Sequence, residues 1–454
     1  MTWHIPLSDL DYGPEEAAAV QRVLQSKWLS MGPETKAFEE EFAAFTGARH
    51  AVAVSNGTAA LHLALLALGV GSGDAILQPA VNFVASANMT KAVGATPVFA
   101  DICSLAEPTI SPESISHLLS SISAPASAPR PKAVIVMHYA GYFCRMAEIR
   151  SLCQEHGLAL IEDACHAVGA RVALPSSISD IPSPAVAAGS LGDIGCFSFF
   201  SNKNLVTGEG GMVTTNRDDI ADKVRNLRSH GMSTLTWDRH RGHAATYDVL
   251  AHGYNYRLDD LRSALGREQL KKLERNNHRR RELTGLYWRK LQPLEARGWV
   301  LPFRHKALGD GRSKMEDGRG APHLDPLPRA EGEAGGSQLP SPASSAGPLS
   351  NGPSSSSPDL PSSCAAHLMT VVAPDTKTRW RCAETLKAAG IQTSLHYPFV
   401  PGFAAFGERG EPGRLPSSAE FCQRVITLPL YSTMTEEQVE TVCGRLVESA
   451  RTDG

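Results

Sequence analysis

The sequence lacks the features that mark several large classes of protein. Its 44 Lys and Arg residues are balanced by 47 Asp and Glu residues, so the net charge of −3 offers no basic face for nucleic acid. The nine cysteines include no Cys-x-x-Cys pair, which argues against a disulfide framework and against a bound metal such as zinc. No stretch reaches the roughly 18 apolar residues of a membrane span, and the first residues lack a signal-peptide core. We therefore expect a soluble, cytoplasmic protein whose partners are small molecules or further copies of itself.

Between residues 48 and 216, short apolar runs alternate with segments of helical period. In Thr58–Leu68, for example, Leu61, Leu65 and Leu68 return to one face. Strands joined by crossover helices form a mostly parallel sheet that is covered on both sides. The pattern predicts an α/β fold with seven strands, at 50–54, 75–78, 96–100, 132–138, 158–163, 195–199 and 211–215.

The second half of the chain has a different pattern. Residues 217–295 look helical, and the Arg279–Arg281 cluster in this region is interpreted as a solvated helix face. After Leu368 a strand, a helix and a strand are expected at 369–374, 379–390 and 391–398, followed by a closing helix at Glu436–Ser449. These elements predict a smaller α+β domain.

A low-complexity stretch separates the two parts. Residues 331–363 contain 22 Gly, Ser or Pro among 33, too little apolar surface to offset the entropy of ordering. The predicted boundaries are 1–270 for an N-terminal segment and the large domain, 271–303 for a connecting helix, 304–366 for a disordered insertion, and 367–454 for the small domain.

The first candidate site follows the strand predicted at 50–54. Gly57 permits a close approach of the backbone, and Thr58 adds a hydroxyl at the start of the next helix. The N–H groups of a first helical turn favour an anion, so a phosphate group can bind here. The alternative is that Ser55 or Asn56 only caps the helix.

Asp163, at the end of the strand predicted at 158–163, is the second candidate. A carboxylate in this position can keep a pyridine nitrogen protonated, which makes the ring an electron sink. His166 follows three residues later and is a candidate to lie over a face of such a ring. An Asp that ends a strand also serves as a helix cap, and that alternative stays open.

Lys203 follows the strand predicted at 195–199 and precedes a glycine-rich turn. A lysine amine at such a point is a candidate Schiff-base nucleophile if its surroundings lower its pKa. Ser198, five residues earlier, offers a hydroxyl to the same phosphate. For Lys203 taken alone, a solvated loop lysine is the alternative.

In order and spacing, these segments resemble the DegT/DnrJ/EryC1/StrS family of sugar aminotransferases, which have the fold-type-I architecture. The resemblance covers nearly the whole chain outside its insertions. The matching blocks are 28–65, GATPVFADI at 94–102, EDACHAVGA at 162–170, FSFFSNK with GEGGMVTT at 197–215, GYNYRLDDLRSALGREQL at 253–270, and GIQTSLHYP at 390–398.

The resemblance implies a pyridoxal 5'-phosphate enzyme with two catalytic side chains at its centre. Lys203 would hold the cofactor as a Schiff base and later shuttle a proton, while Asp163 would pair with the ring nitrogen. His166 would lie against one face of the ring, and Phe83 would flank the cofactor. An amino acid, by family analogy glutamate, would donate the amino group, and a nucleotide-linked keto-sugar would accept it.

The same resemblance implies how the cofactor phosphate is held. Gly57, Thr58 and Ser198 would bind it together with Asn255, which the family contributes from the neighbouring subunit. The enzyme should then be a homodimer with shared active sites. His396 and Tyr397 would lie near the acceptor pocket.

The histidines of residues 228–244 lack the spacing of metal ligands. We therefore expect this segment to form a loop that closes over the substrate rather than a metal site.

Two other functions fit relatives of this kind. Some are dehydratases, in which histidine replaces the Schiff-base lysine, but here Lys203 is intact. A non-catalytic regulator that binds the cofactor would be expected to lose Asp163, Lys203 or the phosphate turn, and all are present. The sequence departs from the family at Asn82, where Thr is more usual, and at Phe200, which is often His.

Overall fold

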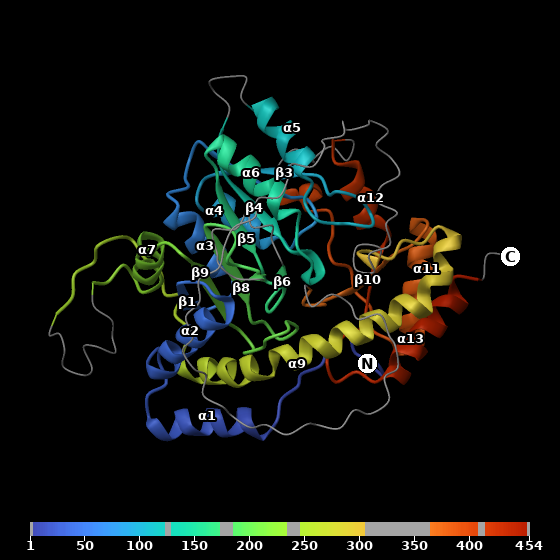
Figure 1. Ribbon diagram of the computed structural model, residues 1–454, viewed down its shortest axis with the longest axis horizontal. Coiled ribbons are helices and arrows are strands. Elements are labelled where there is room, and N and C mark those ends of the chain that lie inside the picture. The colour runs from blue at the N-terminus through green and yellow to red at the C-terminus, as the bar shows by residue number, and fades with distance from the viewer. Residues whose placement is uncertain are drawn as a thin grey trace, which may run out of the picture.

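The computed structural model describes residues 3–122, 129–172, 185–233, 246–304, 364–406 and 414–451. Within these ranges the chain forms a large domain around one mixed sheet and a smaller domain beside it (Figure 1). The long helix α9 (Asp260–Leu291) runs from the one to the other. Asp259 caps this helix, because its side chain accepts a hydrogen bond from the backbone N–H of Arg262.

The large sheet contains the seven strands that the sequence predicts. They are β1 (His50–Val54), β2 (Asp74–Pro79), β3 (Thr96–Ala100), β4 (Arg130–Met137), β5 (Ala159–Asp163), β8 (Ile194–Ser198) and β9 (Gly211–Thr215). Their order is β1-β9-β8-β5-β4-β2-β3, and in this sheet β9 alone runs antiparallel to its neighbours. The carboxyl ends of the other six strands therefore lie along one edge, where α/β proteins place their ligands.

Helices cover both faces of the sheet. One face packs against α3 (Gly57–Ala67), α4 (Ala85–Ala92) and α7 (Asp218–Arg228). The opposite face packs against α2 (Pro33–Thr46), α5 (Pro112–Ile122) and α6 (Met146–His156). Burial on both faces explains why the strands are nearly continuous apolar runs.

Aromatic rings fill much of the second of these layers. Phe38 and Phe42 of α2 pack against Phe197 of β8 and against Phe199, with ring centroids 5.0 to 5.6 Å apart. All four side chains are fully buried. Each such burial stabilises the fold by roughly 1.5–3 kcal/mol, so this cluster fixes the end of β8 that leads into the candidate site.

The expectation of continuous helix over 217–295 is wrong in its middle. Residues 229–233 and 246–259 are not helical and separate α7 from α9. Backbone bonds from Tyr254 to Leu227 and from Tyr256 to Arg228 hold part of this segment extended instead. Residues 234–245, which include most of the loop expected to close over the substrate, lie outside the described residues.

The arginine cluster of α9 is also not a solvated face. Arg280 and Arg281 are 4% and 6% exposed. Arg280 donates to the carbonyl of Leu430 at 2.8 Å, and Arg281 donates to the carbonyl of Cys364 at 3.1 Å. The two guanidinium groups therefore join the connecting helix to the small domain and to the last residues of the predicted insertion.

The small domain contains one expected strand and one unexpected strand. β10 (Met369–Val372) pairs antiparallel with β11 (Val425–Leu428), and not with the predicted strand at 391–398. That segment forms only isolated bridges in the described structure, from Ile391 to Ile5 and from Ser394 to Thr427 of β11. The helices of this domain are α11 (Thr376–Ala388), α12 (Pro416–Arg424) and α13 (Glu436–Ser449).

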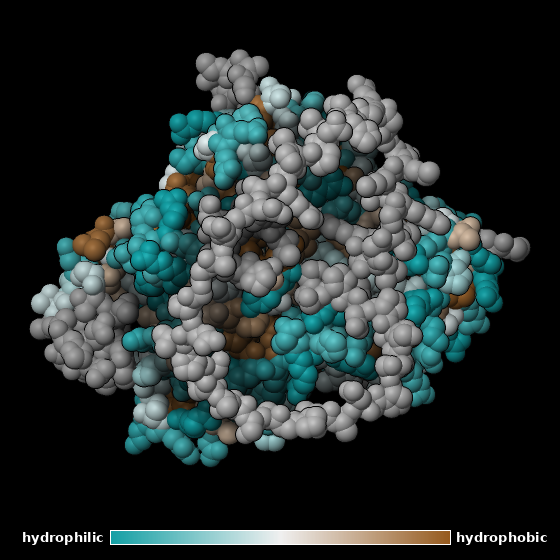
Figure 2. Space-filling view, in the orientation of Figure 1, coloured by the Kyte–Doolittle hydropathy of each residue, from teal (hydrophilic) through white to brown (hydrophobic). Residues whose placement is uncertain are grey.

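Short elements complete the described structure. They are α1 (Pro14–Ser26), the two-stranded β6 (Arg171–Val172) and β7 (Val186–Ala187), and the 3-10 helices Tyr139–Gly141, Gln292–Arg297, Val400–Gly402 and Ala404–Phe406. On the face drawn in Figure 2, hydrophobic residues gather near the middle of the molecule, and hydrophilic residues cover much of the described periphery. Among the described residues, no helix has the length and apolar character needed to cross a membrane.

Ordered structure extends into both ends of the predicted insertion. Residues 305–363 lie outside the described residues, but Arg304 and Cys364 on either side of them are buried. Arg304 pairs with Glu295 at 2.9 Å, and Phe303 stacks on Tyr142 with centroids 4.1 Å apart. Since Cys364, Ala365 and Ala366 are core residues, the ordered chain resumes before the predicted boundary at 367.

Candidate active site

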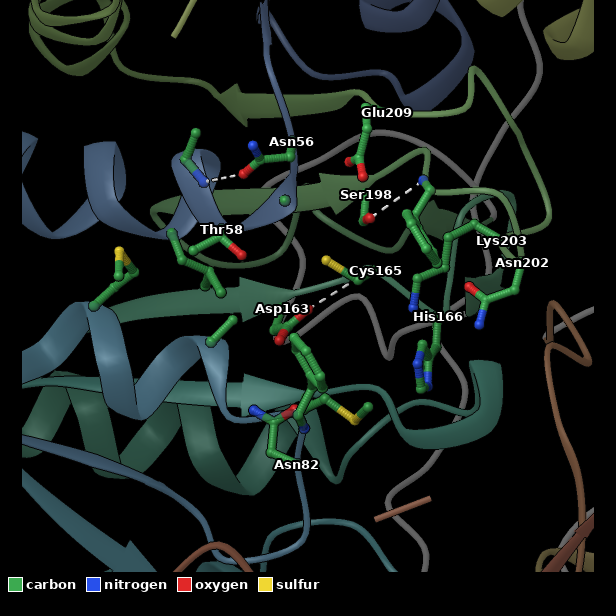
Figure 3. Close-up of a pocket in the computed structure, with 18 of the residues that line it drawn as sticks. Asn56, Thr58, Asn82, Asp163, Cys165, His166, Ser198, Asn202, Lys203 and Glu209 are labelled. Atoms are coloured by element: carbon green, nitrogen blue, oxygen red, sulfur yellow. Dashed lines mark hydrogen bonds between the residues drawn. The ribbon is translucent and has the colours of Figure 1, made fainter. Parts of the chain in front are cut away.

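A cavity of about 590 Å³ opens where the strands β1, β5 and β8 end. Figure 3 shows side chains from separate segments directed into this one space. The lining includes seven of the eight residues that the sequence predicts, which are Gly57, Thr58, Phe83, Asp163, His166, Ser198 and Lys203. The eighth, Asn255, is exposed and does not line the cavity of its own chain.

The turn from β1 to α3 forms one wall. Asn56 has extended backbone, and its side chain accepts a hydrogen bond of 2.8 Å from the N–H of Ala59, so it caps α3 as the alternative reading proposed. The capping role and the binding role are compatible, because Gly57 and Thr58 line the cavity beside it.

Gly57 lies where the turn from β1 to α3 comes closest to β8 and to the loop after β5. A Cβ atom placed on Gly57 would lie 2.8 Å from Cβ of Ser198 and 3.1 Å from Sγ of Cys165. No larger residue fits without displacing β8 or the loop after β5. The glycine therefore brings the N–H groups of the first turn of α3 close to the hydroxyl of Ser198, a combination suited to an anion.

Asp163 ends β5 and is 5% exposed. Its side chain accepts a hydrogen bond of 3.2 Å from the N–H of Cys165. A turn rather than a helix follows, so the helix-cap alternative is wrong. The carboxylate faces the cavity and is available to a partner there.

The neighbouring Glu162 anchors this strand end. Its fully buried carboxylate pairs with Nε2 of His138 at 2.9 Å and accepts backbone N–H groups from Gly189, Leu191 and Gly192. Burial opposes ionisation, but these hydrogen bonds and the charge of His138 hold the pKa of Glu162 below its ordinary value. An ionised Glu162 thus ties β5 to β4 and to the loop before β8.

Lys203 is half-buried and lines the cavity, so it is not a solvated loop lysine. Its N–H donates to the carbonyl of Phe200 at 2.9 Å, which holds the turn after β8. Burial lowers the pKa of Lys203 below its ordinary value, although the nearby Cys165 and Asp163 oppose this effect. A lowered pKa raises the fraction of neutral amine, which is the nucleophilic form.

His166 is buried beside Lys203. Its Nε2 atom lies 2.7 Å from the hydroxyl of Tyr397, and its ring is 4.2 Å from that of His367. Burial, followed by the charge of Lys203, holds the pKa of His166 well below its ordinary value, so the ring is neutral. Its Nδ1 atom is buried and has no hydrogen-bond partner among the described residues.

The small domain supplies the far side of the cavity. Tyr397 and His396 line it, which agrees with the expectation for these residues. The ring of Phe83, 54% exposed, lies 5.9 Å from that of Tyr397. Nδ1 of His396 is 3.0 Å from the hydroxyl of Thr427, and burial lowers the pKa of His396 to about 4.

Sequence reasoning missed several lining residues. Cys165, Asn202 and Tyr256 line the cavity, and each is next or close to a residue that was predicted. Adjacency was the available signal, but it does not tell which neighbours turn inward. Among the described residues, no group of three or more His, Cys, Asp or Glu side chains is arranged to hold a metal ion.

The residues present fit pyridoxal 5'-phosphate. The space beside Gly57, between the first turn of α3 and Ser198, is one that a Cβ atom would fill. Backbone N–H groups at the start of a helix suit the phosphate there. Asp163 suits a protonated ring nitrogen, Lys203 suits the aldehyde carbon, and the buried Nδ1 of His166 has no hydrogen-bond partner among the described residues. The fold and this site define a fold-type-I, pyridoxal-phosphate-dependent transferase.

Comparison with known proteins makes the assignment narrower. Residues 11–308 and 349–447 match the model of the DegT/DnrJ/EryC1/StrS aminotransferase family. The chain belongs to this family, which confirms the resemblance seen in its sequence, and it is an aminotransferase.

The chain is similar to individual relatives over nearly the whole length of both proteins. The chain is 35% identical over 438 residues to the spore coat polysaccharide biosynthesis protein SpsC of Bacillus subtilis, covering 95% of this chain and 93% of that protein. Its structure is similar to the aminotransferase TlmJ from Streptoalloteichus hindustanus, with a TM-score of 0.75, 28% identity and 99% of both chains covered. S. venezuelae DesV, in complex with a ketimine intermediate, gives a TM-score of 0.75 and 28% identity with both chains fully covered.

Proposed function

We propose that the protein uses pyridoxal 5'-phosphate to transfer an amino group from an amino acid, glutamate, to a nucleotide-linked keto-sugar. The observation that carries this proposal is the meeting of an anion-binding turn, a strand-end carboxylate and a half-buried lysine in one cavity. The similarity to a polysaccharide biosynthesis protein of Bacillus subtilis supports a sugar as the acceptor.

Two residues do the central chemistry in this proposal. When bound, the cofactor supplies a ring that withdraws electrons from the substrate carbon and makes its proton acidic. Asp163 keeps the ring nitrogen protonated. Nζ of Lys203 holds the cofactor covalently and, when free, accepts the proton from the α-carbon of the donor; the lowered pKa of Lys203 favours its neutral form for this step.

The other predicted residues orient the cofactor. The N–H groups and hydroxyl at Gly57 and Thr58, with the hydroxyl of Ser198, bind the phosphate. The neutral ring of His166 lies against the pyridine ring without adding a charge, in a position set by its hydrogen bond to Tyr397. Phe83 flanks the cofactor at the mouth of the cavity.

The acceptor enters from the small-domain side in this proposal. His396 and Tyr397 line that end of the cavity, and Phe83 and Phe200 at its rim are 54% and 45% exposed. Aromatic rings at a rim suit the faces of a sugar or a nucleotide base. The tethered nucleotide would then lie outside the cavity, while the keto carbon reaches Lys203.

We further propose a cytoplasmic homodimer in which Asn255 of each subunit completes the phosphate site of its partner. Asn255 is exposed, although the adjacent Tyr256 faces the cavity of its own chain, and this supports a role across an interface. The nine cysteines all lie in the described part of the chain and none forms a disulfide, as expected for a reducing compartment.

The direct test is the absorbance spectrum of the purified protein before and after glutamate is added. We expect a band near the edge of the visible range that moves to shorter wavelength as the amino group is taken up. Keto-sugars linked to different nucleotides, added next, should restore the first band, and the one that does so identifies the acceptor.

Variants make the test specific. Lys203→Ala should abolish turnover, whereas Lys36→Ala on the surface of α2, beside Glu40, should behave as the unaltered protein. Turnover by a colourless Lys203→Ala protein would contradict the proposal. A spectrum that no amino acid alters would contradict it as well.

A further inference from the structure

Tyr256 lines the cavity beside the turn that carries Gly57 and Thr58. Its carbonyl accepts the N–H of Ser55 at 2.7 Å, and its own N–H donates to the carbonyl of Arg228 at 3.0 Å. Hydrogen bonds on both sides of the residue fix its backbone against the end of β1. These bonds therefore fix the position of the Tyr256 Cα atom next to the anion-binding turn.

The side chain of Tyr256 is fixed as well. Its ring stacks on that of Tyr254, with centroids 5.0 Å apart and an interplanar angle of 11°. Its hydroxyl lies 3.1 Å from Nδ1 of His62, a residue of α3 that is 6% exposed. His62 follows Thr58 by four residues, so the two side chains are neighbours on one face of the helix. The hydrogen bond to His62 thus fixes the hydroxyl of Tyr256 beside α3, whose first turn contains Thr58.

The protonation states leave the hydroxyl with a proton to donate. Burial raises the pKa of Tyr256, so the phenol keeps its proton, and burial lowers the pKa of His62, so its imidazole is neutral. A neutral imidazole protonated on Nδ1 donates to the phenol oxygen. The phenol proton is then free to point at an anion, and the hydrogen bond from His62 strengthens it as a donor.

We propose that Tyr256 is a cofactor-binding residue whose hydroxyl donates a hydrogen bond to the phosphate held by Gly57, Thr58 and Ser198, and that His62 positions this hydroxyl. The inference rests on the proposed function, because it requires pyridoxal 5'-phosphate in the cavity. It adds a donor from the subunit's own chain next to Asn255, the residue proposed to serve the partner subunit.

The test compares pyridoxal 5'-phosphate with pyridoxal, which has the same ring and aldehyde but no phosphate. Both are titrated against the cofactor-free protein, and binding is followed by absorbance. A hydrogen bond to a charged group contributes enough that Tyr256→Phe should bind pyridoxal 5'-phosphate about tenfold to a hundredfold more weakly. The same variant should bind pyridoxal within about twofold of the unaltered protein.

Three variants serve as controls. Tyr254→Phe removes a hydroxyl from the stacked ring that does not line the cavity, and it should leave both affinities unchanged. His62→Asn keeps a donor near the place of Nδ1 and should retain most of the affinity for pyridoxal 5'-phosphate. His62→Phe keeps a ring but no donor, and it should lose part of that affinity.

The outcomes separate the inference from the proposed function. Equal affinity of Tyr256→Phe and the unaltered protein for pyridoxal 5'-phosphate overturns the inference and leaves the proposed function intact. An equal loss of affinity for both compounds also overturns it, since the hydroxyl would then act on the ring or on the fold. Failure of the unaltered protein to bind pyridoxal 5'-phosphate overturns the proposed function itself.

Discussion

Replacing Gly57 by alanine should damage both the fold and the cofactor site. The added Cβ would lie 2.8 Å from Cβ of Ser198 and 3.4 Å from the carbonyl oxygen of Phe197. Carbon atoms in contact prefer about 3.5–4.0 Å, so β8 or the start of α3 must move by roughly 1 Å. Overpacking of this kind costs about 1–3 kcal/mol, and the movement pulls the first-turn N–H groups away from the phosphate.

Two measurements on the cofactor-free protein check this expectation. Urea unfolding should give a free energy of unfolding lower by about 1–3 kcal/mol, and titration should give weaker binding of pyridoxal 5'-phosphate. The matched control is Gly444→Ala in α13, where an added Cβ meets nothing within 4 Å. That substitution should raise the stability by up to about 1 kcal/mol, because alanine favours a helix.

A double variant tests the cause of the damage. Ser198→Gly removes the atom that the new Cβ would meet, so Gly57→Ala with Ser198→Gly should recover part of the lost stability. It should not recover the affinity for the cofactor, since the hydroxyl of Ser198 is gone. If Gly57→Ala alone keeps the stability and affinity of the unaltered protein, the close packing at this turn is not what shapes the site.

Three more predictions follow from buried polar groups. Glu162→Gln leaves His138 without its charged partner and should cost about 3–5 kcal/mol in urea unfolding; unchanged stability would show that the pair is not ionised. Tyr397→Phe removes the hydrogen-bond partner of His166, so it should lower kcat and reduce the free energy of unfolding by about 1–3 kcal/mol. A variant with normal kcat would show that this hydrogen bond does not position His166 for the reaction. Because folding lowers the pKa of His396 from 6.5 to about 4, the unfolded chain takes up its proton first as the pH falls. The contribution of His396 to stability should therefore be complete above pH 6.5 and decline by up to about 3 kcal/mol towards pH 4, so His396→Asn should make this part of the profile measured by urea unfolding less steep. Part of the slope should remain, because folding also lowers the pKa of His166.

The large sheet was predictable because its strands are buried on both faces. Runs such as 50–54 and 158–163 carry their own apolar signature, whatever their neighbours are. The small domain was less predictable for the opposite reason. Residues 391–398 mix polar and apolar side chains, residues 425–428 form a short, mostly apolar run, and only the pairing of β10 with β11 decides which of them becomes a strand. That pairing is a tertiary choice that no local pattern contains.

The arginines of α9 illustrate the same limit. From sequence, three consecutive arginines on a charged helix indicate a solvated surface. Arg280 and Arg281 are buried because the carbonyl groups of Leu430 and Cys364, far away in the chain, accept their hydrogen bonds. Burial of a charge depends on such partners, and they become visible only when the chain is folded.

The candidate site was predicted from signals that are individually weak, and the order of the strands explains why they belong together. β1 and β8 are not neighbours, because β9 lies between them. The turn at Gly57 reaches Ser198 only by crossing over the start of β9 at Gly211, where a Cβ would lie 2.6 Å from the backbone of Asn56 and 2.8 Å from the carbonyl of Phe197. The glycine-rich segment after Lys203, which ends at Gly211, therefore does more than form a turn. It leaves room for the anion-binding turn of one strand to meet the lysine that follows another.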